Sequence, residues 1–527
     1  MSLGQRLRGH AVFQPDKAAI EYSTVTTPMS ISYAQLQRDV SLCVDWFSSL
    51  DLRRGDRLAL LALNHPDWFV LLFAAAQYGV VLVPLNWRLS QDELRYVLED
   101  SDPILLLHDS EFESIATGIT ASAERNSDEC KVDNDSGNEC EELTTPVELS
   151  LKCLRLHAAG TSTPSGEEKA EQFSDNRSAG EPLTDALLIV YTSGTTGRSK
   201  GAVLSEQTLL CSAAMSQHMF DLTSADRALN VLPLFHVGGL NIQPLPVLLY
   251  GGTVVLHPRF DAGNAVKSLD NDGITLINSV PTLLQAIIDE PAWTAATLES
   301  LRAISIGSTD VPISLIRQVH ARGIPLLQVY GATETGPVAI YQRLDLSPEE
   351  GSIGRAGLLC EIQLSDAQGL PVALGESGEI WVRGNNVLSA YWNNPAASEE
   401  CLCDGWFRTG DIAHCDEQGN YWFDDRLKHV VISGGENIYP AELERVIREV
   451  PGVQEVSVVG RPDQRWGEVP VAFVVASTDM SEATILTACQ SLARFKHPKG
   501  VIFVDALPRN ALGKIVVAEV RKLLLSH

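Results

Sequence analysis

The 527-residue sequence has a small share of positive charge. It carries 40 lysine and arginine residues against 67 aspartate and glutamate residues, which gives a formal net charge of −27. Binding to a nucleic-acid backbone requires a basic surface, so this balance argues against a nucleic-acid partner. It does not exclude small anionic ligands, because a local cationic site can lie in an acidic protein.

The sequence also lacks signals for a membrane, for secretion and for disulfides. The most apolar stretch, residues 58–85, is interrupted by an Asn-His-Pro-Asp sequence and predicts a strand, a helix and a strand instead of a membrane span. The N-terminus has no apolar core of signal-peptide length. The ten cysteines form no Cys-x-x-Cys pair, and the spacing of Cys401, Cys403, His414 and Cys415 is not a standard zinc pattern. We therefore expect reduced thiols, a cytoplasmic location and no transmembrane segment.

What is present is the composition of a large globular protein. The hydrophobic fraction is 45% and the charged fraction 20%, and a chain of this length predicts two to four domains. Short apolar strands alternate with helical segments over residues 57–108 and 185–330, which is typical of parallel sheets covered by helices. A compact mixture of strands and helices follows from residue 440. We predict an α/β fold with a large N-terminal domain, residues 1–427, and a small α+β C-terminal domain, residues 428–527.

Residues 122–182 differ from both regions. They are crowded with Asp, Glu, Ser, Asn and Gly, and only residues 147–156 have enough apolar side chains to become ordered. Such a composition predicts a mobile acidic insertion that lies outside any site. A regulatory segment is the alternative.

A loop after the apolar residues 186–190 has the composition of a phosphate-binding loop. Its glycines let backbone N–H groups turn toward an anion, and its hydroxyls and lysine add donors. The spacing is not that of a Walker A loop, because the lysine is followed by Gly201 and not by Ser or Thr. The candidate phosphate-binding residues are Thr192, Ser193, Gly194, Thr195, Thr196, Gly197 and Lys200.

A second motif follows another apolar strand and begins at Tyr330. Tyr330 followed by Gly331 offers a flat ring beside a close-approach backbone, which suits a purine. Glu334 has the oxygen ligands that Mg²⁺ prefers beside phosphates, and Thr333 can donate to a phosphate oxygen. The alternative role for Thr333 is to cap a helix.

Three further segments are rich in residues for binding and chemistry. Asp411 ends a Trp-Phe-Arg-Thr-Gly-Asp sequence and could accept bonds from ribose hydroxyls, although a turn aspartate is the simpler alternative. Residues 425–440 hold two adjacent glycines in a charged setting. Lys514 follows Gly513 in a Pro/Asn/Gly-rich loop, where a mobile charge could stabilise a phosphoryl transition state.

These five motifs together resemble the AMP-forming acyl-adenylate superfamily, which includes acyl-CoA synthetases, luciferases and peptide-synthetase adenylation domains. The resemblance covers the chain except residues 122–182, and it departs from the family pattern at Gly307-Ser308-Thr309. It implies that the adenine stacks on Tyr330, that Asp411 and Arg426 contact ribose or phosphate, and that Lys428 is the hinge between the two domains. It also implies Lys514, Glu334, Thr333 and His236 as catalytic residues, with Glu334 holding Mg²⁺.

The resemblance further implies two substrate sites. Pantetheine of CoA would pass Gly434 and Gly435, and Trp466 would pack near it; a core or surface tryptophan is an almost equal alternative. The acyl pocket would be lined by small or apolar residues, with no arginine or lysine for a second carboxylate. Its candidate residues are His236, Gly238, Gly239, Asn241, Ser279, Ile306, Gly307 and Ala332.

The sequence thus predicts an acid:CoA ligase that uses ATP, Mg²⁺ and CoA. A carboxylic acid, a medium or long-chain fatty acid or an aryl acid such as a hydroxycinnamate, would form an acyl-AMP with release of pyrophosphate, and CoA would then displace AMP. One alternative is an adenylate-forming enzyme that delivers to a carrier protein or another acceptor. Another is a non-catalytic nucleotide-binding regulator, which would be expected to lack Lys514 or Glu334. A homodimer is left open.

Overall fold

The structure is a computed structural model of the chain. It describes residues 2–23, 28–120, 142–143, 151–155, 185–193, 198–308, 311, 313–346, 349–366, 368–426, 431–438, 440–476, 480–508, 515 and 517–524. Most of the predicted insertion at 122–182 therefore lies outside the described residues, and whether it is mobile stays a prediction. Its strand Lys152–Arg155 (β7) pairs with β5, inside the segment expected to become ordered.

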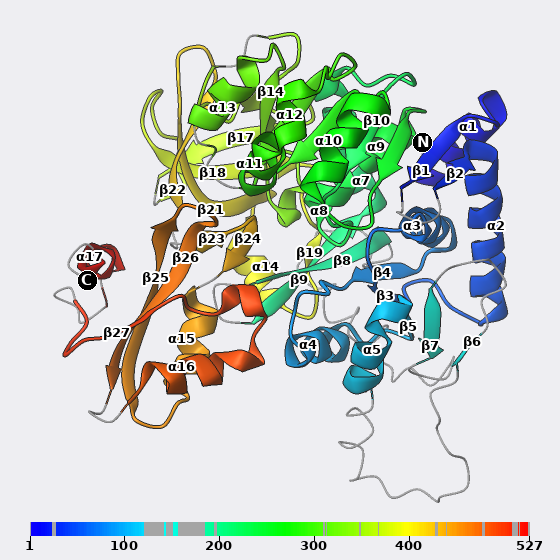
Figure 1. The fold of residues 1–527 in the computed structure, drawn as a ribbon. Coiled ribbons are helices and arrows are strands. Elements are labelled where there is room, and N and C mark those ends of the chain that lie inside the picture. The colour runs from blue at the N-terminus through cyan, green and yellow to red at the C-terminus, as the bar shows by residue number, and fades with distance from the viewer. Residues whose placement is uncertain are drawn as a thin grey trace, which may run out of the picture.

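Two large sheets form the N-terminal part of the molecule (Figure 1). The nine-stranded sheet has the order β16-β15-β14-β13-β12-β10-β11-β1-β2, in which β1 and β10–β14 pair in parallel and β2, β15 and β16 are antiparallel edges. Its strands are β1 (Ala18–Tyr22), β2 (Met29–Ser32), β10 (Arg227–Asn230), β11 (Thr253–Leu256), β12 (Leu276–Ser279), β13 (Ala303–Gly307), β14 (Leu326–Tyr330), β15 (Ile340–Tyr341) and β16 (Arg355–Ala356).

The eight-stranded sheet has the order β19-β9-β8-β4-β3-β5-β7-β6. Its centre, β8, β4, β3 and β5, is parallel, and β8 and β9 form an antiparallel pair. Its strands are β3 (Arg57–Leu61), β4 (Val81–Pro84), β5 (Leu105–His108), β6 (Glu142–Leu143), β7, β8 (Ala186–Ser193), β9 (Ser199–Ser205) and β19 (Ala390–Tyr391).

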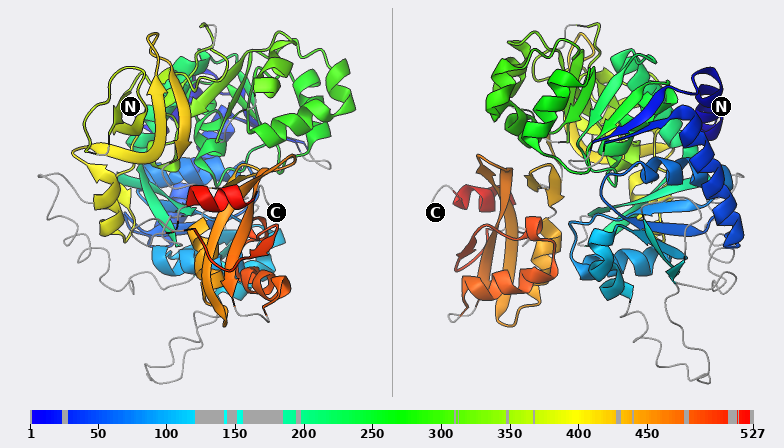
Figure 2. Two further views of the ribbon diagram at one scale, coloured as in Figure 1. Left: turned by 90° about the vertical axis from the view of Figure 1, so that its left-hand side faces the viewer. Right: turned by 45° about the vertical axis from the view of Figure 1, so that its right-hand side comes forward.

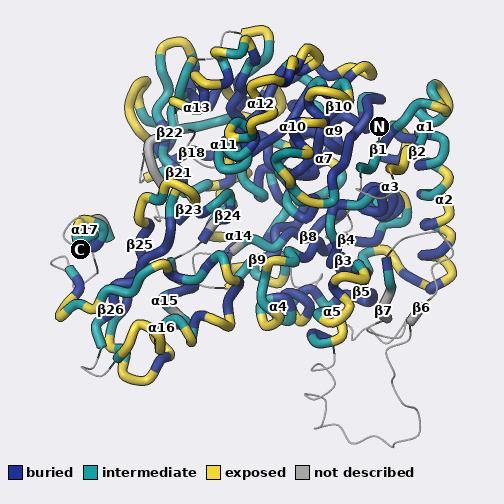
Figure 3. Tube along the Cα trace, in the orientation of Figure 1, coloured by how far each residue is buried: buried dark blue, intermediate teal, exposed yellow. Residues whose placement is uncertain are grey.

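Helices pack between and outside these sheets. Helix α3 is apolar all round, and its residues 67–75 are buried, so it suits a position between two sheets. The largest core cluster joins α2, α3 and α7 to strands of both sheets, and it appears as the dark blue interior of Figure 3. The helices of this part are α1 (Leu3–Phe13), α2 (Tyr33–Ser49), α3 (Asp67–Tyr78), α4 (Gln91–Ser101), α5 (Glu113–Thr120), α7 (Glu206–Phe220), α8 (Val237–Asn241), α9 (Pro244–Leu249), α10 (Ala262–Asn271), α11 (Pro281–Asp289), α12 (Pro291–Ala295), α13 (Ile313–His320) and α14 (Pro395–Cys401).

A third sheet follows, and it is antiparallel throughout. Its strands are β17 (Cys360–Ser365), β18 (Gly378–Gly384), β20 (Leu402–Cys403), β21 (Trp406–Cys415) and β22 (Tyr421–Arg426). The sequence analysis did not predict this sheet, because its longer strands mix apolar residues with charged and polar ones and none is apolar along its whole length.

The C-terminal sheet is separate from the others (Figure 2). Its long strands β25 (Val453–Asp463) and β26 (Gly467–Ala476) are flanked by β23 (Val431–Ser433), β24 (Glu436–Ile438) and β27 (Val501–Phe503). Helices α15 (Pro440–Arg448) and α16 (Glu482–Ala488) bury one face of this sheet, and α17 (Val517–Leu523) buries residues of the other.

The observed elements confirm the predicted α/β fold with a large domain of parallel sheets and a smaller C-terminal domain. The change of sheet falls between Arg426 and Val431, across residues 427–430, which lie outside the described residues. The exact boundary at 427 and 428 stays a prediction. Within the described residues, no helix combines the length and hydropathy needed to cross a membrane.

Candidate active site

The β8–β9 hairpin presents two of the predicted phosphate-binding residues next to each other. Thr192 and Lys200 are partners across the antiparallel pair, and the Thr192 hydroxyl lies 3.5 Å from the Lys200 carbonyl oxygen. Gly201 allows a close approach, since a Cβ there would lie 2.7 Å from Ile189 Cγ2. The Thr192 hydroxyl and the Lys200 ammonium therefore lie at the two ends of the predicted phosphate-binding loop between β8 and β9.

Glu334 of the second motif lies against this hairpin. It sits in a short 3₁₀ helix, η5 (Thr333–Thr335), and is only 9% exposed. Its Oε1 accepts a hydrogen bond from the Tyr391 hydroxyl at 2.7 Å and a long one from the Thr192 hydroxyl at 3.4 Å. The Lys200 ammonium lies 5.3 Å from the centre of the Tyr391 ring. The first two motifs are therefore joined through Tyr391.

The second and third motifs are joined through Tyr330 and Asp411. The Tyr330 hydroxyl donates to Asp411 Oδ2 at 2.8 Å, and Asp411 is buried in β21 opposite Arg426. Asp411 belongs to a strand, so the simple turn role is wrong. Gly331 is required by packing, because a Cβ there would lie 1.8 Å from the Pro337 carbonyl oxygen.

The three glycines among the predicted acyl-pocket residues fall into two groups. Gly239 and Gly307 face backbone, since a Cβ would lie 2.1 Å from the Pro233 carbonyl oxygen and 2.3 Å from that of Val329, respectively. Gly238 has only Ile242 Cδ1 within 4 Å of its Cβ position, at 3.9 Å, and so borders open space. Packing explains the first two glycines, and only Gly238 has room for a side chain.

The other pocket candidates are mostly buried and polar or small. Asn241 donates to the Gly336 carbonyl oxygen at 2.9 Å, and Ser279 ends β12 beside Val280. Ala332 directly precedes η5, and its N–H donates to the Thr335 hydroxyl. Ile306 is fully buried in the core formed with helices α10–α13, so core packing accounts for its apolar side chain.

The predicted CoA-binding residues of the C-terminal domain lie together. The Gly434 N–H donates to the Trp466 carbonyl oxygen at 2.8 Å, and a Cβ at Gly434 would lie 2.7 Å from Trp466 Cε3. Both glycines have positive φ, 58° and 84°, which side chains disfavour. Trp466 remains 40% exposed, so it is not a core residue.

This glycine pair also reaches the N-terminal domain at the acyl site. A Cβ at Gly435 would lie 3.4 Å from Cγ2 of Val280, the residue after Ser279. The next residue, Glu436, places Oε2 3.4 Å from His236 Nε2 and accepts a hydrogen bond from Arg88 through Oε1. The C-terminal domain therefore packs its glycine loop beside Val280 and the predicted acyl-pocket residue His236.

Glu436 stays charged although it is buried. Burial alone would raise the pKa of its carboxyl group, but the charges and hydrogen bonds of His236 and Arg88 lower that pKa to about 2. The Arg88 guanidinium is also held 5.1 Å from the Trp87 ring. The contact between the domains is thus an ionic cluster around one buried carboxylate.

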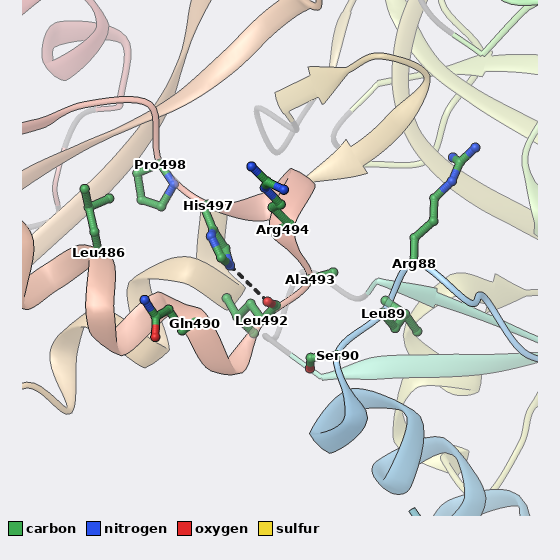
Figure 4. A pocket seen from close by; sticks show the side chains of 10 residues that line it. All are labelled: Arg88, Leu89, Ser90, Leu486, Gln490, Leu492, Ala493, Arg494, His497 and Pro498. Carbon is green, nitrogen blue, oxygen red and sulfur yellow. Dashed lines mark hydrogen bonds between the residues drawn. The ribbon is translucent and has the colours of Figure 1, made fainter. Parts of the chain in front are cut away.

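A cavity of about 630 Å³ lies next to this cluster, where residues 88–90 face the C-terminal domain (Figure 4). Arg88 lines it from the N-terminal domain, and Arg494 and His497 line it from the C-terminal domain. His497 is oriented by a 3.0 Å contact between its Nε2 and the Leu492 carbonyl oxygen. The cavity is therefore shared by two domains and has a cationic lining.

Several predicted site residues lie outside the described part of the chain. These are Gly194, Thr195, Thr196 and Gly197 of the loop, the hinge residue Lys428, Lys514, and the side chains of Ser193 and Arg426. Their roles stay predictions. Among the described residues, no group of three or more His, Cys, Asp or Glu side chains could hold a metal ion by itself.

The structure also reveals site residues that the sequence analysis missed, namely Arg88, Tyr391 and Glu436. Tyr391 lies in a two-residue strand with no pattern of its own. Arg88 and Glu436 are 348 positions apart in the chain, so their pairing is not visible in the sequence. The Gly-Gly-Glu sequence was a usable signal for Glu436, because a carboxylate beside two glycines in a binding loop is unusual.

Comparisons with known proteins identify the family of the chain. The family model "AMP-binding enzyme" matches residues 7–392, and "AMP-binding enzyme C-terminal domain" matches residues 442–514. Indoleacetate–CoA ligase of Aromatoleum aromaticum is 42% identical over 99% of this chain and 98% of its own length. Feruloyl-CoA synthase of an Amycolatopsis species is 38% identical over 94% of each chain.

A solved structure of o-succinylbenzoate CoA synthetase from Bacillus subtilis, a double variant bound to a product analogue, has a TM-score of 0.80. It is 29% identical, and the match covers 98% of this chain and 97% of that chain. The same enzyme bound to its acyl-adenylate intermediate has a TM-score of 0.64 at the same identity and coverage. This chain thus resembles the product-analogue complex more closely.

The chain belongs to the AMP-binding enzyme family. It is an acid–thiol ligase that uses ATP to join a carboxylic acid to CoA. The predicted enzyme class is therefore confirmed, and the predicted non-catalytic alternative is not supported.

Proposed function

We propose that this ligase activates an aryl or arylalkanoic monocarboxylic acid. The curated relatives described above act on indoleacetate and ferulate, which both carry an aromatic ring and one carboxylate. None of the candidate pocket residues is an arginine or lysine that could pair a second carboxylate. Burying an unpaired carboxylate in such a pocket would be costly, which favours a monocarboxylate.

The ATP side of the proposal rests on the cluster around Glu334. Both hydrogen bonds of its carboxylate within the described residues go to Oε1, so Oε2 can face a hard cation. The donor set fits Mg²⁺ shared with ATP phosphates, and bound Mg²⁺ would neutralise charge on the phosphates. Tyr330 and Asp411 would hold the adenosine, and Lys200 and Thr192 the phosphates.

The CoA side rests on one observation, the insertion of Gly434-Gly435-Glu436 beside His236 and Val280. This orientation leaves the two glycines where a thin thiol-bearing arm could reach an acyl group. In adenylate formation the C-terminal domain would instead turn about Lys428 and bring Lys514 to the phosphates. The higher TM-score against the product-analogue complex supports assigning the present orientation to thioester formation.

The cavity between the domains is the proposed entry for the phosphate-bearing end of CoA. Arg494 and His497 would attract its phosphates, and Trp466, beside Gly434, would lie along the path to the acyl site. We keep the cytoplasmic location and a homodimer as predictions.

The test is a panel of acids supplied with ATP, Mg²⁺ and CoA, in which pyrophosphate and acyl-CoA are both measured. We expect the highest kcat/KM with indole-3-acetate or ferulate, a lower value with octanoate, and the lowest with succinate and malonate. Best activity with octanoate would assign the enzyme to fatty acids. Best activity with succinate would contradict the pocket described here, and pyrophosphate without acyl-CoA would point to another acceptor.

A further inference from the structure

A second set of contacts joins the two domains away from His236, at the first turn of α4. Ser90 caps this helix: its hydroxyl accepts from the Glu93 N–H at 3.3 Å, and its own N–H donates to Glu93 Oε2 at 2.8 Å. This reciprocal pair is a capping box. The Glu93 carboxylate is therefore oriented by its own helix before it meets any other element.

Both carboxylate oxygens of Glu93 reach the C-terminal domain. Oε2 accepts from the Ala493 N–H at 2.8 Å, and Oε1 accepts from the Lys496 ammonium at 2.5 Å. Beside them, the Ser90 hydroxyl donates to the Ser491 carbonyl oxygen at 2.5 Å. One helix end thus binds the segment 491–496 through backbone and side chain together.

Lys496 lies between two carboxylates that come from different domains. Its ammonium donates to Glu442 Oε1 at 2.8 Å as well as to Glu93, and its side chain is only 5% exposed. Burial lowers the pKa of Lys496, but the charges of Glu442 and Glu93 outweigh it and raise that pKa. The buried ammonium therefore stays protonated.

The two carboxylates differ in their dependence on domain orientation. Glu442 belongs to α15 in the same domain as Lys496, so their pair persists when that domain turns. Glu93 belongs to the other domain, so its bonds to Ala493 and Lys496 exist only in the orientation seen here. A contact present in one of two states shifts the equilibrium toward that state.

We propose that Glu93 is a positioning residue for thioester formation. Its hydrogen bonds to Ala493 and Lys496, here called the latch, hold the C-terminal domain so that Gly434-Gly435 stays at the acyl site. The inference rests on the proposed assignment of this orientation to the second half-reaction. Adenylate formation does not use the latch, because Tyr330, Glu334 and Asp411 belong to the N-terminal domain and the C-terminal domain would have turned to bring Lys514 to the phosphates.

The decisive variant is Glu93→Gln. Glutamine at this position also supports a capping box, and its amide oxygen can still accept from Ala493, so helix α4 is preserved while the charge is lost. We expect acyl-CoA formation from supplied acyl-AMP and CoA to fall about tenfold, as for loss of one charged hydrogen bond. Acyl-AMP formation, followed by pyrophosphate exchange, should stay within about twofold of wild type.

Two matched variants serve as controls. Glu99→Gln makes the same change on an exposed position of the same helix and should alter neither half-reaction. Glu442→Gln removes the partner of Lys496 within its own domain and should not lower the ratio of thioester formation to adenylate formation. Hydrogen–deuterium exchange of residues 489–496 should be faster in Glu93→Gln than in wild type or Glu99→Gln.

The outcomes separate the latch from the proposed function. Suppose that the wild type is active in both half-reactions. The latch would then be overturned if Glu93→Gln left the ratio of thioester formation to adenylate formation unchanged, or lowered both half-reactions equally. A wild-type enzyme that forms acyl-AMP but converts none of it to acyl-CoA would overturn the proposed function instead.

Discussion

The two halves of the candidate active site are built in different ways. The adenylate half, with Tyr330–Asp411 and Tyr391–Glu334, is joined by neutral–ionic hydrogen bonds inside one domain. The acceptor half is joined by ion pairs between domains, Arg88–Glu436 and Glu93–Lys496, and His236 Nε2 lies 3.4 Å from Glu436 Oε2. These contacts of the first half do not depend on the orientation of the domains, whereas those of the second half exist only while the domains are docked as they are here.

This difference suits the chemistry of a two-step ligase. A buried ion pair contributes little net stability, because desolvation opposes the attraction between its charges. It does favour one geometry strongly, since a misplaced buried charge is costly. When the two domains separate, water solvates these charges again. The ion pairs can therefore define the docked orientation without making it irreversible.

The largest effect should come from a residue that serves the adenylate half alone. Lys514→Ala should lower acyl-AMP formation about a hundredfold or more, because the Lys514 ammonium would no longer stabilise the negative charge on the transferring phosphoryl oxygens. Conversion of supplied acyl-AMP to acyl-CoA should be spared. Rapid-quench assays of each half-reaction measure both rates, and an equal loss in both would refute the division.

A smaller effect is expected at Tyr391, which orients Glu334. Tyr391→Phe should reduce adenylate formation about tenfold and raise the KM for MgATP, because Glu334 Oε1 loses its shorter hydrogen bond. Tyr78→Phe is the matched control, since the Tyr78 hydroxyl donates to the Leu52 carbonyl oxygen at the same 2.7 Å, and Tyr78 packs against the core as a partly buried residue. If both variants lowered only the melting temperature, Tyr391 would have no role in the site.

The smallest effect should distinguish two adjacent glycines. Gly238→Ala should fold normally and lower kcat/KM for bulky acids a few-fold, because its Cβ meets only Ile242 Cδ1 at 3.9 Å. Gly239→Ala should lower the melting temperature, because its Cβ would lie 2.1 Å from the Pro233 carbonyl oxygen. Thermal unfolding and kinetics of both variants test this, and equal thermal shifts would contradict the assignment of Gly238 to the pocket.

The sequence predicted the parallel sheets well, because strands such as β3, β11 and β14 are short apolar runs between helical segments. It did not predict the antiparallel sheet with its mixed strands. The adenylate residues could be found from motifs, since each lies in a short segment that combines glycine with residues for binding.

The acceptor half was harder to predict, because its contacts join residues far apart in the chain. Arg88 and Glu93 look like ordinary surface charges until the C-terminal domain packs against them. Gly307 and Gly239 seemed to make room for a substrate, but the structure shows that neighbouring backbone occupies that space. Sequence patterns report local conformation, whereas these features depend on tertiary packing.

The central claim is that docking of Glu436 against His236 and Arg88 builds the acceptor half. The most direct measurement is the fate of acyl-AMP in Glu436→Gln with saturating ATP, acid and CoA. We predict adenylate formation at the wild-type rate, thioester formation lowered about thirtyfold by loss of the buried charge, and acyl-AMP accumulating in solution. Thioester formation at the wild-type rate, or adenylate formation reduced by the same factor, would contradict the account.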